Sequence, residues 1–446
     1  MILNDIRKEF TKIYKNNMRI LILGSGGREH AFAWKLSQSP LCEKLFIAPG
    51  NAGTMQYGTN LDFGVNDFNS IKNCCIDEKV DLVLVGPEEP LVKGVSDYLK
   101  NEPAFKDLEI IGPSKDAAQL EGSKAFAKAF MQKFNIPTAA YKEFTLSNYQ
   151  EGIDYLKNHS LPVVLKADGL AAGKGVVICE NHVEALAEFE LMIQRAKFGE
   201  AGKKVVVEEF LDGIELSVFV LFDGKNYVIL PEAKDYKRVG EGDHGPNTGG
   251  MGAVSPVPFA DEIFMNKVEE KIIRPTIEGL KTEGLDYCGF IFLGLIKVNE
   301  EPYVIEYNCR MGDPETEVVL PRLKNDFAGL LHATAKQELH KIKIEMDPRF
   351  ACAVVAVSGG YPGVYEKGLT ISGLEDVKTA TGILFHAGTK LKDDEIVTNG
   401  GRVLCMTSFG NTLELAVQRS LFELEKISFT GMSYRKDIGY EFYEQE

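Results

Sequence analysis

Apolar runs that end in glycine or proline recur through the first quarter of the chain. They are MRILILG (18–24), KLFIAPG (44–50), DLVLVGPE (81–88) and EIIGPS (109–114), and helix-like stretches separate them. Short buried strands that alternate with helices are typical of a parallel sheet, and such sheets bind ligands in the loops at the carboxyl ends of their strands. The sequence therefore predicts an α/β region with a ligand site along that edge of the sheet.

The first of these loops, GSGGREH, is similar to a dinucleotide-binding loop but lacks two of its features. Glu29 occupies the position of the third glycine, and the second strand has no acidic residue at its end. Both departures disfavour a nicotinamide-dependent oxidoreductase. A phosphate or substrate loop at the N-terminus of a helix fits better, with Arg28 as a charge partner.

The totals of the sequence limit the class of protein. A chain of 446 residues is too long for one core, so about three domains are expected. The net charge of −15 argues against a general affinity for nucleic acid or for an anionic membrane. The eight cysteines are scattered and are expected to be free thiols in a reducing compartment. The mixed-charge residues 1–17 resemble neither a signal peptide nor a transit peptide, so the predicted location is the cytoplasm.

The segment KADGLAAGKGVVI places Lys166 and Lys174 on either side of a loop that is nearly free of side chains. Glycine allows the backbone N–H groups to approach a ligand, and together with lysine this suits phosphate. The segment is not a Walker loop, because Gly175 follows Lys174 where that motif has serine or threonine. A glycine-rich hairpin with two solvated lysines explains the segment alone equally well, so the rest of the chain must decide.

From residue 161 onward the pattern changes to strands and hairpins. Between two predicted hairpins lies the glycine-rich segment VGEGDHGPNTGGMGAVSP (239–256). This composition predicts irregular structure, and in a compact enzyme such a segment is more often a functional lid than a linker. A final strand-rich region begins after about residue 345.

Glu306 and Asn308 stand two apart in the predicted strand YVIEYNCR, so their side chains share one face. The same alternation puts Val304 on that face and Tyr307 on the other. A carboxylate beside an amide oxygen offers hard ligands that suit Mg²⁺. A solvent-facing strand edge is the alternative, but the polar residues of NCRMGDPETE that follow directly favour a site.

Motifs distributed from Met18 to nearly the end of the chain resemble the glycinamide ribonucleotide synthetase family, within the ATP-grasp superfamily. They are GSGGREHA, VGPEEPLVKG, KADGLAAGKGV, GPNTGGMGA, NCRMGDPETE and NGGRVLC. The resemblance implies a mixed α/β fold (α+β in parts) with a parallel α/β domain, a two-part ATP-grasp domain and a small strand-rich domain. The implied boundaries are an extension at 1–17, a substrate domain at 18–121, the ATP-grasp domain at 122–345 with a lid at about 138–208, and a C-terminal domain at 346–446.

The resemblance also implies the reaction and the residues that perform it. ATP and glycine would form glycyl phosphate and ADP, and the amine of phosphoribosylamine would then displace phosphate, with Mg²⁺ or Mn²⁺ as cofactor. Implied ATP contacts are Lys124, Lys166, Gly173, Lys174, Glu208, Leu211 and Glu215, and the implied metal ligands are Glu306 and Asn308. Arg310 and Asp313 would face the reacting groups, and Gly26, Gly27, Arg28, Glu88, Asp235, Lys390 and Arg402 would bind substrate.

Two departures and two alternatives accompany this interpretation. The strand FIFLGL lacks the acidic second metal ligand of many superfamily members, and the segment LPEAKDYKR around Asp235 is shorter than in relatives. One alternative is another ATP-grasp carboxylate–amine ligase or carboxylase of purine biosynthesis. The other is a nucleotide-sensing module without turnover. In each case the expected partners are small molecules, with no nucleic acid and no membrane, and the chain is expected to be a monomer.

Overall fold

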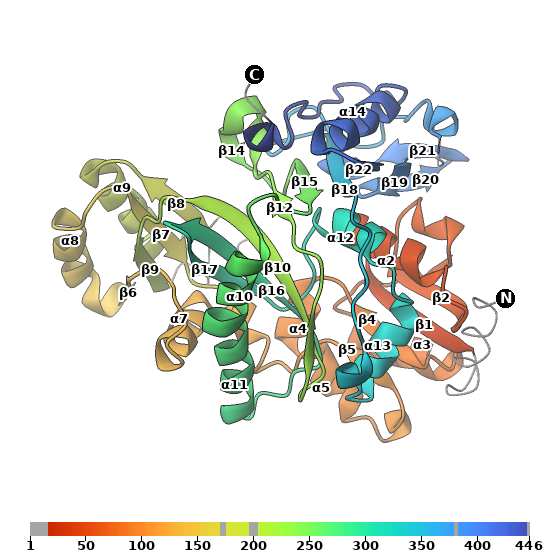
Figure 1. Ribbon diagram of the computed structural model, residues 1–446, viewed down its shortest axis with the longest axis horizontal. Coiled ribbons are helices and arrows are strands. Elements are labelled where there is room, and N and C mark those ends of the chain that lie inside the picture. The colour runs from red at the N-terminus through yellow and green to blue at the C-terminus, as the bar shows by residue number, and fades with distance from the viewer. Residues whose placement is uncertain (1–16, 170–174, 196–203, 379–381, 444–446) are drawn as a thin grey trace.

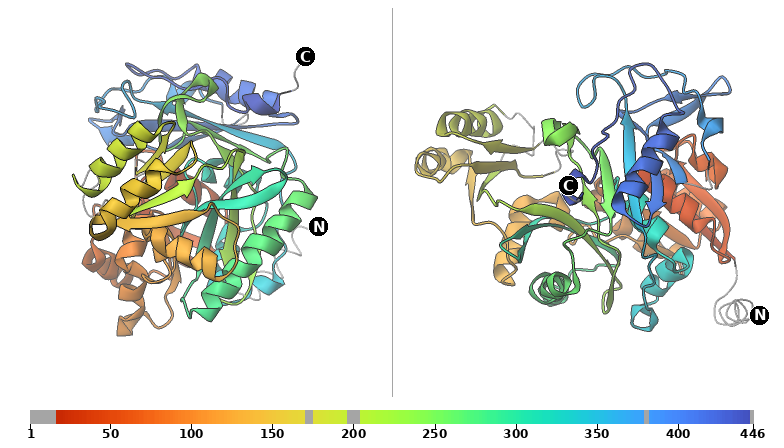
Figure 2. Two further views of the ribbon diagram at one scale, coloured as in Figure 1. Left: turned by 90° about the vertical axis from the view of Figure 1, so that its left-hand side faces the viewer. Right: turned by 45° about the horizontal axis from the view of Figure 1, so that its top comes forward.

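The computed structural model describes residues 17–169, 175–195, 204–378 and 382–443. The N-terminal and C-terminal regions lie against a central region, from which a small lid of strands and helices projects (Figures 1 and 2). Gly173, Lys174 and residues 1–16 of the predicted extension lie outside the described residues. No helix in the described part of the chain is long and apolar enough to cross a membrane. None of the eight cysteines, all of which are among the described residues, forms a disulfide bond.

The N-terminal region is a parallel sheet with strand order β3-β2-β1-β4-β5, as the apolar runs predict. Alternate residues of β1 face two different cores. Ile20 and Ile22 pack with Phe32 of α2, whereas Leu21 and Leu23 pack with the helices on the other face. The elements are β1 (Met18–Gly24), α2 (Gly27–Leu36), β2 (Cys42–Pro49), β3 (Thr59–Asn60), α3 (Phe68–Asp77), β4 (Leu82–Val85), α4 (Glu88–Lys93), α5 (Val95–Lys100) and β5 (Glu109–Ile111).

The central region contains two antiparallel sheets. The lid sheet has the order β6-β9-β7-β8 and is covered by α8 and α9, and the body sheet has the order β11-β10-β16-β17 (Figure 1). Helix α7 joins the N-terminal region to the lid. The elements are α6 (Gln119–Gly122), α7 (Lys124–Lys133), β6 (Tyr141–Thr145), α8 (Tyr149–Lys157), β7 (Val163–Ala167), β8 (Val176–Cys179), α9 (His182–Ile193), β9 (Lys204–Glu209), β10 (Ile214–Phe222), β11 (Tyr227–Ile229), α10 (Glu262–Val268), α11 (Arg274–Thr282), β16 (Gly289–Val298), β17 (Glu301–Asn308), α12 (Thr316–Arg322) and α13 (Phe327–Ala335).

A bulge in β17 changes which side chains share a face. Glu306 pairs with Gly294 of β16, but Leu295 pairs with Val304, so Ile305 is an extra residue on β17. Val304 is therefore completely buried in the same core cluster as Tyr307. The prediction that Val304 shares a face with Glu306 and Asn308 is wrong, because an inserted residue interrupts the two-residue alternation.

The C-terminal sheet has the order β12-β15-β18-β22-β19 and takes two strands from before residue 345. The expectation that 239–256 is irregular is wrong, because this segment contains part of the β13–β14 ribbon and all of β15. Gly252 allows β15 to approach β18 closely, since a Cβ on this residue would lie 2.6 Å from the carbonyl oxygen of Ala353 on β18. The elements are β12 (Lys234–Asp235), β13 (Arg238–Gly240), β14 (His244–Asn247), β15 (Gly252–Ser255), β18 (Phe350–Val357), β19 (Gly382–His386), β20 (Thr389–Lys392), β21 (Glu395–Thr398), β22 (Arg402–Gly410) and α14 (Leu413–Leu424).

Candidate active site

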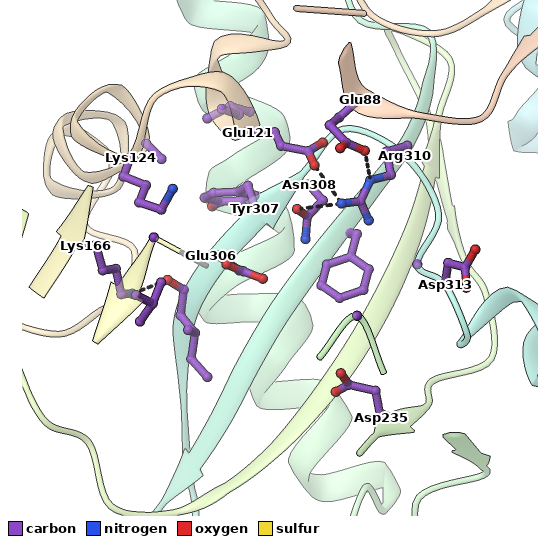
Figure 3. Close-up of a pocket in the computed structure, with 18 of the residues that line it drawn as sticks. Glu88, Glu121, Lys124, Lys166, Asp235, Glu306, Tyr307, Asn308, Arg310 and Asp313 are labelled. Carbon is purple, nitrogen blue, oxygen red and sulfur yellow. Dashed lines mark hydrogen bonds and ion pairs between the residues drawn. The ribbon is translucent and has the colours of Figure 1, made fainter. Parts of the chain in front are cut away.

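A cavity of about 470 Å³ lies where the lid, the body sheet and the N- and C-terminal regions meet. Side chains from β7, α7, β17 and α4 line it (Figure 3). Arg402 of β22 lines it as well. Its cations are Arg28, Lys124, Lys128, Lys166, Lys237, Arg310 and Arg402, and its carboxylates are Glu88, Glu121, Glu208, Asp235, Glu306, Asp313 and Glu315. Charged side chains that converge on a buried cavity are costly unless they are paired, and a charged ligand would supply partners for them. The cavity therefore suits a charged ligand.

Lys124 and Lys166 reach the end of the cavity where Glu306 lies (Figure 3). Nζ of Lys124, the first residue of α7, donates to the carbonyl oxygen of Gly169 at 2.9 Å. Nζ of Lys166, on β7, donates to the carbonyl oxygen of Ile305 at 3.2 Å. Burial lowers the pKa of Lys124, although the charge of Glu306 acts in the opposite direction. The two lysines therefore bring positive charge from the lid and from α7 to one place.

Asp168 holds the start of the glycine-rich loop against α7. Its carboxylate accepts hydrogen bonds from Oγ of Ser123 at 3.0 Å and from the backbone N–H of Ala125 at 3.1 Å. Ser123 is also the N-cap of α7, because its Oγ accepts from the backbone N–H of Phe126. One carboxylate at a helix N-terminus thus fixes Asp168 and Gly169, the start of the loop, relative to Lys124.

Glu208 is predicted to lie beside adenine, and its side chain makes contacts of its own. Oε2 of Glu208 lies 3.1 Å from Nζ of Lys128 and 3.0 Å from Nζ of Lys166. Lys128 lines the cavity but is absent from the predicted site. Its position one helical turn after Lys124 is the signal that puts both lysines on the same face of α7.

Glu306 and Asn308 both line the cavity from β17 (Figure 3). A Cβ at Gly294 of the neighbouring strand would lie 3.1 Å from Cγ of Glu306, so glycine there leaves room for the carboxylate. Oδ1 of Asn308 accepts a hydrogen bond from Nη2 of Arg310 at 3.3 Å. Among the described residues no group of three or more His, Cys, Asp or Glu side chains is arranged to hold a metal ion. The carboxylate–amide pair offers hard oxygen atoms of the kind that suit Mg²⁺, an ion that keeps waters and also binds substrate phosphates.

Two carboxylates hold Arg310 at the other end of the cavity. Nε of Arg310 lies 3.3 Å from Oε2 of Glu88, and Nη2 lies 2.8 Å from Oε1 of Glu121. Burial raises the pKa of Glu121 to about 7, against the effect of Arg310. Burial would also raise the pKa of Glu88, but Arg310 and Arg28 lower it. Glu121 is absent from the predicted site, and nothing in its local pattern distinguishes it from a surface carboxylate.

Arg402 and Asp313 form an ion pair between the C-terminal and central regions. Nη1 of Arg402 lies 2.9 Å from Oδ1 of Asp313 and donates to the carbonyl oxygen of Gly249 at 2.7 Å. The backbone N–H of Arg28 donates to the other carboxylate oxygen of Asp313 at 3.4 Å. Residues from three regions of the chain therefore converge on Asp313.

Gly26 and Gly27 lie beside the cavity and do not line it. A Cβ at Gly26 would lie 3.0 Å from Oδ2 of Asp313, and one at Gly27 would lie 2.2 Å from Oε1 of Glu317. The two glycines thus admit carboxylates of the chain itself to the N-terminus of α2. Glu29 completes this arrangement, because its Oε2 accepts from the backbone N–H of Gly26 at 2.6 Å.

Of the four remaining predicted residues, two line a cavity and two do not. Asp235 lines it, and Glu215 lines a smaller cavity next to it; both pair with Lys237. Leu211 is half-buried after β9, and Lys390 is exposed on β20. Neither Leu211 nor Lys390 is among the residues that line the cavity.

The fold and the site together define an ATP-grasp enzyme: two antiparallel sheets meet at one cavity, with lysines on one side and a carboxylate–amide pair on the other. The chain belongs to the phosphoribosylglycinamide synthetase family. Its residues 18–121, 122–316 and 351–441 match the N domain, the ATP-grasp (A) domain and the C domain of that family. The family resemblance, the fold class and the prediction of a ligase are confirmed.

Relatives and solved structures agree with this assignment. The phosphoribosylamine–glycine ligase of Caldanaerobacter subterraneus subsp. tengcongensis is 46% identical over 421 residues, which cover 94% of this chain and 99% of that protein. The Escherichia coli K12 ligase is 46% identical over 433 residues, covering 96% and 100%. The solved phosphoribosylamine–glycine ligase from Thermotoga maritima has a TM-score of 0.78 at 37% identity, covering 94% and 100%. The biotin carboxylase domain of the Hydrogenobacter thermophilus 2-oxoglutarate carboxylase shares the fold, with a TM-score of 0.69 at 17% identity, covering 94% and 92%.

Proposed function

We propose that this chain joins glycine to 5-phosphoribosylamine at the expense of ATP, forming glycinamide ribonucleotide, ADP and phosphate. The observation that supports this most is the convergence of Lys124, Lys166, Glu306, Asn308 and Arg310 on one cavity. Relatives that match nearly the whole chain are named for this reaction. The reaction has two steps: the carboxylate of glycine attacks the γ-phosphorus of ATP, and the amine of phosphoribosylamine then displaces phosphate from glycyl phosphate.

ATP would lie between the lid and the body sheet. Lys124 and Lys166 would bind its phosphates. The predicted closure of the 169–175 loop over them lies largely outside the described residues. Glu208, Leu211 and Glu215 stay predictions for the base and the ribose. Phosphoryl transfer depends on charge neutralisation and positioning more than on a protein nucleophile, which is the kind of help that these side chains give.

Glu306 and Asn308 would hold Mg²⁺ or Mn²⁺. Their oxygens fit such an ion, because a hard carboxylate and a hard amide oxygen line one cavity from the same strand. When bound, the ion would neutralise charge on the phosphates of ATP. Asn308 would orient its Oδ1 through its hydrogen bond from Arg310.

Arg310 and Asp313 would act on the groups that react. The guanidinium of Arg310 would orient the glycine carboxylate, held in place by Glu88 and Glu121. In the second step the amine nitrogen bonds to the acyl carbon, phosphate leaves, and the nitrogen loses a proton. Asp313 is the carboxylate that we assign to accept this proton, with Arg402 holding its orientation.

Arg402 and Arg28 are the cavity cations that we assign to the sugar phosphate, and Glu88 and Asp235 would contact the sugar. The roles of Lys390, Gly26 and Gly27 stay predictions. All of these residues belong to one chain, so we propose that a monomer contains the complete site. Sedimentation of the active enzyme tests that part of the proposal.

The test is ADP release with glycine and phosphoribosylamine, in which each substrate is left out in turn. Full activity should require both, together with a divalent cation. ADP release that needs bicarbonate in place of glycine would instead indicate a carboxylase on the same fold. ATP binding without ADP release under any of these conditions would indicate a nucleotide sensor.

A further inference from the structure

Lys128, Glu208 and Lys166 form a buried ionic group at the junction of the lid and the body. The three residues are 2%, 3% and 6% exposed, in that order, and all three line the cavity. Oε2 of Glu208 is shared between the two ammonium groups, at 3.1 Å from Lys128 and 3.0 Å from Lys166. Two cations and one carboxylate leave the group with one net positive charge.

The two lysines differ in how many other partners they have. Besides Glu208, Nζ of Lys128 donates to Oγ1 of Thr138 at 2.8 Å and to the carbonyl oxygen of Ala139 at 3.1 Å. These three acceptors match the three N–H bonds of an ammonium group. Lys166 has Glu208 and the carbonyl oxygen of Ile305 at 3.2 Å among the described residues, which leaves one N–H bond for a ligand. Lys128 is thus fully engaged, whereas Lys166 is able to change its partner.

We propose that Lys128 is a positioning residue that keeps the Glu208 carboxylate paired while Lys166 turns from Glu208 to the phosphates of ATP. The inference rests on the proposed function, which assigns Lys166 to those phosphates. Breaking a buried ion pair is costly chiefly because it leaves one charge without a partner. With Lys128 in place, Glu208 retains a cation at 3.1 Å after Lys166 has moved.

Without Lys128 the same group would oppose ATP binding. Glu208 and Lys166 would form a neutral buried pair, and Lys166 would leave an unpaired carboxylate behind on moving to phosphate. The cavity would also lose one positive charge. Both effects weaken the binding of an anionic ligand, and removing the negative charge of Glu208 as well would offset both.

Lys128 also has a structural role, and the test must separate it from the effect of Lys128 on the charge of Glu208. Thr138 and Ala139 lead into β6, and Glu208 lies near the end of β9, so Lys128 also ties together the two strands that connect lid and body. A purely structural tie would be damaged by any loss of Lys128, whatever the charge of residue 208.

The experiment is a double-mutant cycle with Lys128→Met and Glu208→Gln. The dissociation constant of a non-hydrolysable ATP analogue with Mg²⁺ is measured by calorimetry, alongside the KM for ATP. Lys128→Met should weaken binding about tenfold or more, the cost of losing one charge-assisted contact. Adding Glu208→Gln should bring binding back to within about threefold of wild type, because no carboxylate then competes for Lys166 and the predicted adenine contact of residue 208 is largely through its backbone. Lys133→Met, which removes an exposed lysine from the same helix, is the matched control and should have no effect.

A double variant that binds as weakly as Lys128→Met, or more weakly, would overturn the inference in favour of a structural tie. Circular dichroism and thermal melting check that each variant is folded. Should Lys128→Met not fold, Lys128→Arg and the double variant carry the test, because both should bind within about threefold of wild type and a loss in either would overturn the inference. Lys166→Met distinguishes the two proposals: unchanged ATP binding would overturn the proposed role of Lys166 and the inference together, whereas weaker binding without recovery in the cycle would overturn the inference alone.

Discussion

Replacing Arg402 with alanine tests whether the C-terminal region binds the sugar phosphate. Nη1 of Arg402 is held by the carbonyl oxygens of Gly249 and Asp313, both at 2.7 Å, and by the Asp313 carboxylate at 2.9 Å. These contacts use one of the three guanidinium nitrogens, and the residue lines the cavity. A charge-assisted contact to phosphate contributes about 1.5–3 kcal/mol. Arg402→Ala should therefore raise the KM for phosphoribosylamine about ten- to a hundredfold.

The same substitution removes the cation beside Asp313, so kcat should fall as well. Steady-state kinetics with each substrate varied separately measures both effects. The KM for ATP should stay within about twofold, because the lysines of the lid and α7 are untouched. Lys392→Ala, on the exposed hairpin of the same region, is the control. An unchanged KM for phosphoribosylamine would refute the assignment, and an equal rise in the KM of all three substrates would indicate damaged domain closure instead.

Three further predictions concern the metal ligands, the glycine pair and the buried carboxylates. Glu306→Ala should reduce turnover by about two orders of magnitude or more at fixed Mg²⁺, with unchanged circular dichroism; near-normal activity would put the metal elsewhere. Gly27→Ala should lower the free energy of unfolding by about 1–3 kcal/mol in urea titrations, since its Cβ would lie 2.2 Å from Glu317. Glu317→Ala in the same chain should restore part of that loss, and no recovery would contradict the packing argument. Burial raises the pKa of Glu121 from 4.5 to about 7, so the folded chain binds this proton more tightly than the unfolded chain does. The resulting contribution to the stability of the fold is fully present below pH 4.5 and is lost as the pH rises through about 7. The stability advantage of wild type over Glu121→Gln should therefore fall by up to about 3 kcal/mol between about pH 5 and about pH 8 in thermal melts, and an equal difference at both pH values would refute the shift.

The parallel sheet and the shared face of Glu306 and Asn308 were predictable because local patterns encode them. Buried parallel strands need continuous apolar runs, and the four runs found in the sequence are β1, β2, β4 and β5. Glu306 and Asn308 share a face because they follow the bulge at Ile305 and not because the whole strand alternates regularly. Val304, which precedes the bulge, shows where that regularity ends.

Other features depend on contacts between distant segments, which a single sequence does not reveal. β15 is a strand because β12 and β18 pair with its two edges, and its own composition of small residues and glycine predicts a loop. Gly26 and Gly27 resemble a phosphate loop, but two of the carboxylates that occupy the space beside them, those of Asp313 and Glu317, come from nearly 300 positions away. Glu121 becomes recognisable as a site residue when Arg310 lies beside it.

The two ends of the cavity balance their charges in opposite ways. At the lysine end two cations share one carboxylate, so an anionic ligand finds a positive charge without leaving Glu208 unpaired. At the Arg310 end two carboxylates share one cation, and burial raises the pKa of Glu121 to about 7, so a proton serves in place of a second cation. A ligand that brings negative charge to the first end takes over a cation from a carboxylate. A ligand that brings an ammonium group to the second end displaces a proton, so the uptake of such a group should be tighter as the pH rises through about 7.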